Sequence, residues 1–239
     1  MKTFRIALAL ILTFICSFNT EAQPNVDLSL TNNLQKITVD KFTLLYVSKE
    51  AQPFAKGTKI NFGYADDESS MPLAKLNLSS NQKESIIIAY SDGASDDPQF
   101  IFYKETQPKK YQYLFTIDAE QLIIPGNSFI YSSGSANNMF DQRRKFKVVN
   151  DALTEIKQPF YAIGLKTKTL KAITIYSDKN LKTPVATIAA NSPIEVVASE
   201  YNEEEIKFFL IKSEFGLLGW WKQNDSSAEE IKGLIYNGD

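Results

Sequence analysis

Apolar residues recur at about every second position along most of this chain, in short runs rich in Ile, Val, Phe and Tyr. Such an alternation lets one face of a segment enter a core while the other face meets water, which is typical of antiparallel β structure. The pattern predicts strands over residues 36–47, 59–64, 85–90, 99–104, 111–117, 128–131, 145–149 and 154–163. No long helical periodicity appears in this part of the chain.

Polar turn residues separate these predicted strands. They lie at Asp92-Gly93, Gln107-Pro108, Pro125-Gly126-Asn127 and Asn150-Asp151. The clearest hairpin joins residues 145–149 to residues 154–163 across the two-residue turn Asn150-Asp151. Seven or eight strands without helices predict an all-β N-terminal domain, either an antiparallel β-sandwich or an open barrel, over residues 23–165.

A stretch rich in Lys and Thr, residues 164–169, then interrupts the apolar runs, and we place a domain boundary there. The second domain, residues 166–239, continues with short apolar runs that end in Gly219-Trp220-Trp221. Its strands are expected over residues 172–176, 185–188, 194–198 and 207–212. Overlapping Ser-x-x-Glu patterns at Ser226 and Ser227 predict a short terminal helix.

The order of these segments resembles the bacterial SH3 domain family, over about residues 170–224. The resemblance rests on Val185-Ala186-Thr187-Ile188 with Ile194-Glu195-Val196-Val197, and on Gly219-Trp220-Trp221, which matches the family's Gly-Trp followed by an apolar residue. Asn191 stands where the family has a turn glycine, and Asn tolerates the positive φ of such a turn. Glu203-Glu204-Glu205-Ile206 replaces the family's Gly-Trp ahead of the fourth strand. The resemblance implies a small five-stranded SH3-like barrel of an exported cell-envelope protein.

The N-terminus has the layout of a secretory signal, which we assign to residues 1–22. Lys2 and Arg5 give a positive start, residues 6–15 form an apolar centre, and Thr20-Glu21-Ala22 closes a polar end. About ten apolar residues are too few to span a hydrocarbon core of about 30 Å. We therefore expect an exported protein, periplasmic or extracellular, with no integral membrane segment once the signal is removed.

Histidine is absent from the sequence, and the single cysteine, Cys16, lies at the end of the apolar N-terminal run. Lipid attachment at Cys16 is the weaker alternative to cleavage, because the large Ile15 precedes it. The mature chain therefore lacks the residues for a Ser-His-Asp or Cys-His nucleophile, for a thiolate or imidazole zinc site, and for a disulfide. We expect no enzyme activity, no metal and no cofactor.

The charge of the chain argues against two classes of partner. The formal net charge is −2 and no basic block occurs, which argues against binding to nucleic acid and against electrostatic binding to membranes. A glycosidase that uses two facing carboxylates is the remaining enzymatic interpretation, and no pair of acidic residues in the sequence points to it specifically.

Trp220 and Trp221 are the only tryptophans in the chain. Adjacent strand residues point to opposite faces, so one ring is expected in the core and the other outside, and the resemblance places Trp221 in the core. An outward Trp220 would form one wall of a groove for a peptide or glycan, with Tyr176 and Tyr201 nearby. Simple packing at the end of the barrel is the alternative.

Two further features are candidates for contacts with a partner. Arg143 and Arg144 offer planar guanidinium groups that suit the carboxylates of a cell-wall peptide, and an ion pair with Asp141 is the alternative. Residues 208–211, Phe-Phe-Leu-Ile, are apolar on both faces of a strand. We expect one face in the core and the other packed on the N-terminal domain or a partner.

Together these features predict an exported, non-catalytic binding protein that recognises a cell-wall peptide or an envelope protein through its SH3-like module. The alternative is a structural module, in which the SH3-like barrel supports the N-terminal domain. A carboxylate-dependent glycosidase is a remote third possibility.

Overall fold

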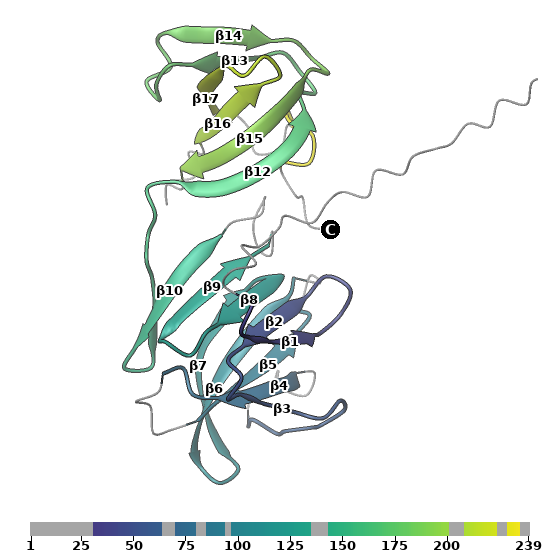
Figure 1. Ribbon diagram of the computed structural model, residues 1–239, viewed down its shortest axis with the longest axis vertical. Coiled ribbons are helices and arrows are strands. Elements are labelled where there is room, and N and C mark those ends of the chain that lie inside the picture. Colours follow the sequence, from purple (N-terminus) through teal and green to yellow (C-terminus); the bar gives the residue numbers. More distant parts are fainter. Residues whose placement is uncertain are drawn as a thin grey trace, which may run out of the picture.

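The computed structural model describes residues 31–63, 70–79, 85–93, 97–134, 143–200, 208–223 and 229–234. This part of the chain consists of strands and turns, without a helix, so the predicted all-β class is confirmed (Figure 1). The strands form three sheets, and none of these sheets closes on itself. Within the described ranges, no helix is long and apolar enough to cross a membrane.

The first sheet has six strands in the order β1-β2-β8-β9-β10-β11. They are β1 (Gln35–Thr38), β2 (Leu44–Val47), β8 (Gln121–Ile124), β9 (Phe129–Ser133), β10 (Arg144–Val149) and β11 (Ala152–Glu155). β2 and β8 pair in parallel, whereas the other neighbours in this sheet are antiparallel. Strand β8 had no predicted counterpart in the sequence pattern.

Two turns at the ends of this sheet follow from local chemistry. The hairpin predicted across Asn150-Asp151 is confirmed by the β10–β11 pair. Residues 36–47, expected to be one strand, instead form the hairpin of β1 and β2. The Asp40 carboxylate accepts the backbone N–H groups of Phe42 and Thr43, both at 2.7 Å, and these bonds hold the chain in a turn.

The second sheet is an antiparallel meander in the order β3-β4-β5-β6-β7. Its strands are β3 (Gln52–Pro53), β4 (Met71–Leu76), β5 (Ile86–Ser91), β6 (Gln99–Gln107) and β7 (Lys110–Asp118). The strand predicted over residues 59–64 is wrong for its described part, because residues 59–63 form a loop over the outer face of this sheet. Phe62 in this loop is buried against Ile87 and Tyr103, which explains an apolar residue in a non-strand segment.

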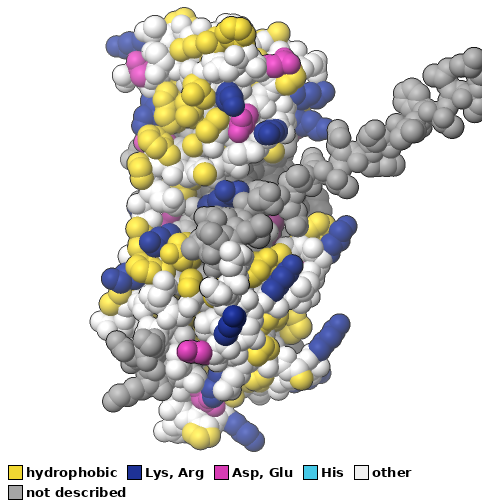
Figure 2. Space-filling model, viewed as in Figure 1, with side chains coloured by type: hydrophobic (Ala, Val, Ile, Leu, Met, Phe, Trp, Pro, Cys, Tyr) yellow, Lys and Arg dark blue, Asp and Glu magenta, His cyan; other side chains and the backbone are white. Residues whose placement is uncertain are grey.

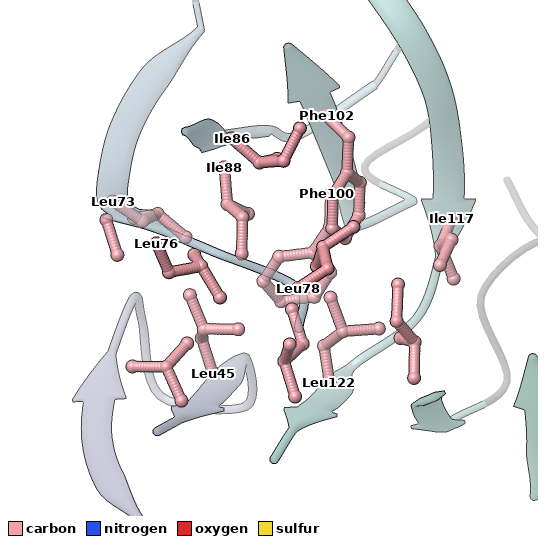
Figure 3. Packing of buried hydrophobic residues seen from close by; sticks show 14 of the residues in the cluster. Leu45, Leu73, Leu76, Leu78, Ile86, Ile88, Phe100, Phe102, Ile117 and Leu122 are labelled. Atoms are coloured by element: carbon pink, nitrogen blue, oxygen red, sulfur yellow. The ribbon is translucent and has the colours of Figure 1, made fainter. Parts of the chain in front are cut away.

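One hydrophobic core lies between the first and second sheets (Figure 3). Leu45 and Leu122 reach into it from the parallel pair of the first sheet, and Ile88, Phe100 and Phe102 reach into it from the second. All five side chains are fully buried. Burial of one such side chain contributes about 1.5–3 kcal/mol, so this shared core holds the two sheets together as sandwich-like layers.

The third sheet forms the upper lobe in Figure 1, with the order β12-β15-β16-β17-β13-β14. Its strands are β12 (Tyr161–Lys168), β13 (Ile173–Tyr176), β14 (Pro184–Ile188), β15 (Pro193–Glu200), β16 (Phe208–Ser213) and β17 (Leu218–Lys222). They have a core of their own, in which Ile175, Val196, Phe209, Ile211 and Trp221 are buried. Asn191 adopts a φ of 63°, as predicted for a turn position that tolerates Asn.

The connection between the two lobes differs from the expected one. Residues 154–163, expected to be one strand, are divided between β11 and β12, and the chain crosses over residues 156–160. The stretch rich in Lys and Thr is not a linker, because it continues β12 as far as Lys168 and pairs with β15. Its exposed residues Lys166 and Lys168 alternate with half-buried Leu165 and Thr167, a period of two that suits an edge strand.

The terminal helix predicted from Ser226 and Ser227 is not formed by the described residues 229–234. Backbone bonds tie this segment to the end of β12 and to the chain just beyond it: Lys232 donates its N–H to the carbonyl of Lys168, and Leu170 donates its N–H to the carbonyl of Glu230. Ile231 pairs with Thr169 as an isolated antiparallel β-bridge, and this pairing uses peptide groups that a helix would need. Ser226 and Ser227 themselves lie outside the described residues.

Candidate binding site

The two adjacent tryptophans point to opposite faces of β17, as predicted. Trp221 is buried in the core of the third sheet, where its ring centroid lies 5.8 Å from that of Phe209. Trp220 is half-buried on the other face. The alternation of β17 therefore places one indole in the core and leaves the other indole partly open to solvent.

A row of outward side chains crosses the third sheet through Trp220. The Cα of Trp220 is opposite Leu210 of β16 and Tyr176 of β13, and Leu210 is in turn opposite Ala198 of β15. The structure thus brings Trp220 and Tyr176 together, as predicted. Tyr201, the third expected member, lies outside the described residues.

Phe160 joins this group from the segment that connects the two lobes. Its ring centroid lies 5.6 Å from that of Trp220, with the ring planes tilted by 37°. Phe160 remains 47% exposed, so the pair still presents aromatic surface to solvent. The sequence pattern did not identify this residue as part of the site, because residues 154–163 read as one continuous strand. The site also includes half-buried Phe208, which lies two residues before Leu210 in β16 and therefore on the same face.

We call this surface the aromatic face, made of Phe160, Tyr176, Phe208, Leu210 and Trp220. Figure 2 shows hydrophobic side chains gathered over β16 and β17 in the upper lobe, with basic and acidic side chains beside them. Leu210 and Phe208 belong to the apolar run 208–211, whose outer face was expected to be covered. That face is only half-buried here, so it can contribute to a binding surface.

A charged pair lies at the edge of the aromatic face. The Lys179 ammonium contacts both carboxylate oxygens of Glu200, each at 2.6 Å. The same nitrogen lies 5.6 Å from the centroid of the Trp220 ring, within the range of a cation–π interaction. The two side chains are 39% and 32% exposed, so both charges stay accessible to a ligand. Lys179 comes from the loop between β13 and β14, where no motif marked it in the sequence.

The predicted arginines lie elsewhere, at the junction of the two lobes. The backbone carbonyl of Arg143 accepts a hydrogen bond from Gln158 Nε2 at 2.9 Å, and the charge of Arg144 acts on Tyr161. Asp141, the expected ion-pair partner, lies outside the described residues. The contacts that define Arg143 and Arg144 are therefore with the connecting segment and the start of β12.

Tyr161 forms a polar link across this junction. Its side chain is buried, and its hydroxyl donates to Glu155 Oε1 at 2.7 Å, from the first strand of the third sheet to the last strand of the first sheet. Burial, followed by the neighbouring Glu155 carboxylate, raises the pKa of Tyr161 to about 12. The hydroxyl is therefore a hydrogen-bond donor throughout the physiological pH range.

No group of three or more Asp, Glu, His or Cys side chains among the described residues lies close enough to hold a metal ion. No protein-family model, curated protein or solved structure matches the chain. The aromatic face, with its adjacent ion pair, is thus the best-defined candidate site in the described part of the molecule.

Proposed function

We propose that this chain is an exported, non-catalytic binding protein that recognises a cell-wall peptide through the aromatic face of its third sheet. In this proposal the third sheet is a divergent bacterial SH3-like barrel, and the apolar N-terminal stretch directs export. The observation that carries the proposal is the packing of Phe160 on Trp220 next to the Lys179–Glu200 pair. An envelope protein is the alternative partner, separated from a wall peptide by the experiment below.

The chemistry of the face suits a peptide with charged groups of both signs. Flat aromatic rings cover apolar side chains and peptide planes with little loss of conformational entropy. The ammonium of Lys179 can bind a ligand carboxylate, and the carboxylate of Glu200 can bind a ligand amine, both beside Trp220. Cell-wall peptides carry amines and carboxylates close together, so the Lys179–Glu200 edge of the aromatic face can bind both groups of one ligand.

The experiment is co-sedimentation of the mature chain, without residues 1–22, with purified cell-wall sacculi. Trp220→Ala should lower the bound fraction by about tenfold or more, because a central aromatic side chain carries a large share of binding energy. Phe215→Ala is the matched control, since Phe215 is 89% exposed on the β16–β17 turn and outside the aromatic face. This control should sediment like the wild type.

Folding of the variant can be read from the same protein. In Trp220→Ala the only remaining tryptophan is Trp221, which is buried, so a blue-shifted emission spectrum reports an intact core. A folded Trp220→Ala that still sediments like the wild type would refute the aromatic face as the site. Failure of the wild type to sediment would refute the wall ligand and favour an envelope protein, to be identified by cross-linking from Tyr176.

A structural role is the second candidate, favoured by the contacts at the junction. Phe160 packs on Trp220 and Tyr161 bonds Glu155, so the third sheet also holds the connecting segment in place. On this alternative, Trp220→Ala would lower the stability of the chain, and the wild type would bind no sacculi. Urea denaturation alongside the sedimentation assay distinguishes the two functions.

A further inference from the structure

A second surface with binding chemistry lies at the opposite end of the molecule, on the outer face of the second sheet. There, residues 59–63 and the β6–β7 turn enclose an open groove of about 750 Å³. Lys59 and Asn61 line it from the loop, and Lys109, Lys110 and Tyr111 line it from the turn and the start of β7. The groove shares no lining residue with the aromatic face.

The floor and the wall of this groove are held by packing. Phe62 is 3% exposed and stacks on Tyr103, with ring centroids 3.9 Å apart and planes 9° from parallel. Tyr111 meets the edge of Phe62 at 5.2 Å and keeps part of its own ring exposed. Asn61 Oδ1 accepts the N–H of Gly63 at 2.8 Å, which fixes the turn at the rim. The groove is therefore preformed, and a ligand would not need to order it.

The charged side chains among the described lining residues of the groove are all lysines. Lys59, Lys109 and Lys110 are exposed, and within the described residues none of the three forms an ion pair. The neighbouring acidic group is Glu105, opposite Tyr111 in the β6–β7 pair, and it is bonded to Lys75. That bond lowers the pKa of Glu105, so its charge is already compensated by Lys75. Among the described residues of the groove, the lysine ammonium groups are therefore the charges that can act on a ligand.

We propose that this groove binds an acidic polysaccharide, a sugar chain that carries carboxylate or phosphate groups. The lysines supply point charges for the anionic groups, the exposed part of Tyr111 packs on a sugar ring, and the Asn61 amide can bond a hydroxyl. The described lining residues of the groove include no arginine, whose planar guanidinium makes the bidentate contacts typical of nucleic-acid recognition. This site does not depend on the function proposed for the aromatic face.

The test is a titration of the full mature chain with polygalacturonate at low ionic strength, with neutral dextran, phosphorylated dextran and inorganic polyphosphate as comparison ligands. Lys109→Gln/Lys110→Gln should weaken polygalacturonate binding by about fivefold for each lysine removed. Lys36→Gln/Lys147→Gln is the matched control, because it removes the same charge from exposed positions on the first sheet. This control should bind like the wild type.

The comparison ligands separate the parts of the proposal. Polygalacturonate binding that weakens with added salt, with no binding of dextran, is the expected result. A phosphate-bearing sugar polymer that binds more tightly than polygalacturonate would identify phosphate as the preferred anionic group, within the same proposal. Bare polyphosphate that binds as tightly as either sugar polymer would overturn the assignment to a polysaccharide. Equal effects of the two double variants would overturn the groove as the site, and Trp220→Ala should leave this binding unchanged.

Discussion

Gly219 occupies the point of closest approach between β17 and β13. A Cβ built on this glycine would lie 2.8 Å from the Cβ of Ile175 and 3.0 Å from the carbonyl oxygen of Tyr176. Real side chains do not approach so closely, and both neighbours belong to a buried strand that cannot move away freely. The Gly-Trp-Trp sequence therefore combines a close contact, an outward indole and a core indole in three consecutive residues.

Replacement of Gly219 by Ala should lower the free energy of unfolding by about 1–3 kcal/mol, because overpacking forces the strands apart. Urea denaturation followed by Trp221 fluorescence measures this change. Leu218→Ala is the control at the adjacent position, since Leu218 is 52% exposed, and it should change stability by no more than about 0.5 kcal/mol. Equal stability of Gly219→Ala and the wild type would contradict the close contact.

At the scale of single residues, the sequence predicted what strand alternation controls. The opposite directions of Trp220 and Trp221 follow from the pleat alone, and their environments agree with it. Phe160 and Lys179 could not be predicted, because each reaches Trp220 from a loop or connection. A loop position is set by tertiary packing, which no local period in the sequence records.

The β10–β11 hairpin shows how two residues set the register of an element. Asn150 and Asp151 have φ values of 51° and 64°, and two consecutive positive φ values define a type I′ turn. This turn matches the right-handed twist of the flanking strands. Asp151 also binds the Lys104 ammonium at 2.7 Å, so the turn of the first sheet is joined to β6 of the second.

Asn150→Ala should destabilise the protein by about 1–2 kcal/mol, because a positive φ is more strained for Ala than for Asn. Asn150→Gly should retain or slightly raise the stability, since Gly adopts this conformation without strain. Thermal unfolding of the two variants against the wild type measures both effects. The same loss of stability in both variants would point to a side-chain contact of Asn150 instead of its backbone conformation.

At the scale of elements, the pattern predicted the amphipathic strands better than the buried ones. All four residues of β8 are buried, so its sequence, Gln-Leu-Ile-Ile, shows no alternation of polar and apolar positions. Strand β4 is interrupted by Pro72 and is also covered on most of its length. A strand buried on both faces lacks the period of two on which the prediction depends. The pattern also missed the turn at Asp40 within residues 36–47, where the carboxylate accepts two backbone N–H groups after β1.

In the part of the chain that the structure describes, the two largest hydrophobic clusters lie in separate lobes joined by a short connection, and the small cluster around Phe62 covers the outer face of the second sheet. One core lies between the first two sheets and the other belongs to the third sheet. Glu155 and Tyr161 flank residues 156–160 and are bonded to each other, and Gln158 within this connection donates a hydrogen bond to the backbone carbonyl of Arg143. The sequence predicted two units, and it placed their boundary in β12 because Lys-rich edge strands and linkers have similar composition.

Tyr161→Phe should lower the free energy of unfolding by about 1–3 kcal/mol at pH 8, because it leaves Glu155 without the hydroxyl donor. The folded-state pKa of Tyr161 is raised from 10.0 to about 12, so the neutral hydroxyl is favoured by folding. This contribution is fully present below pH 10 and is lost as the pH rises through about 12. The stability difference between wild type and variant should therefore narrow over this range. A difference that stays constant from pH 8 to pH 12 would contradict the bond to Glu155.

The parallel pairing of β2 with β8 also has a consequence for how the chain folds. In the sequence, the five strands of the second sheet all lie between these two partners. Closing so long a loop lowers the entropy of the chain before the contacts between β2 and β8 can form. We therefore expect β8 to pair with β2 late in folding. We expect the antiparallel meander to assemble first, from contacts between neighbours in the chain. Before β8 pairs with β2, Leu45 and Val47 of the β1–β2 hairpin, which are buried in the folded protein, remain exposed to solvent. An intermediate with this apolar surface uncovered is the stage of folding most exposed to aggregation and proteolysis.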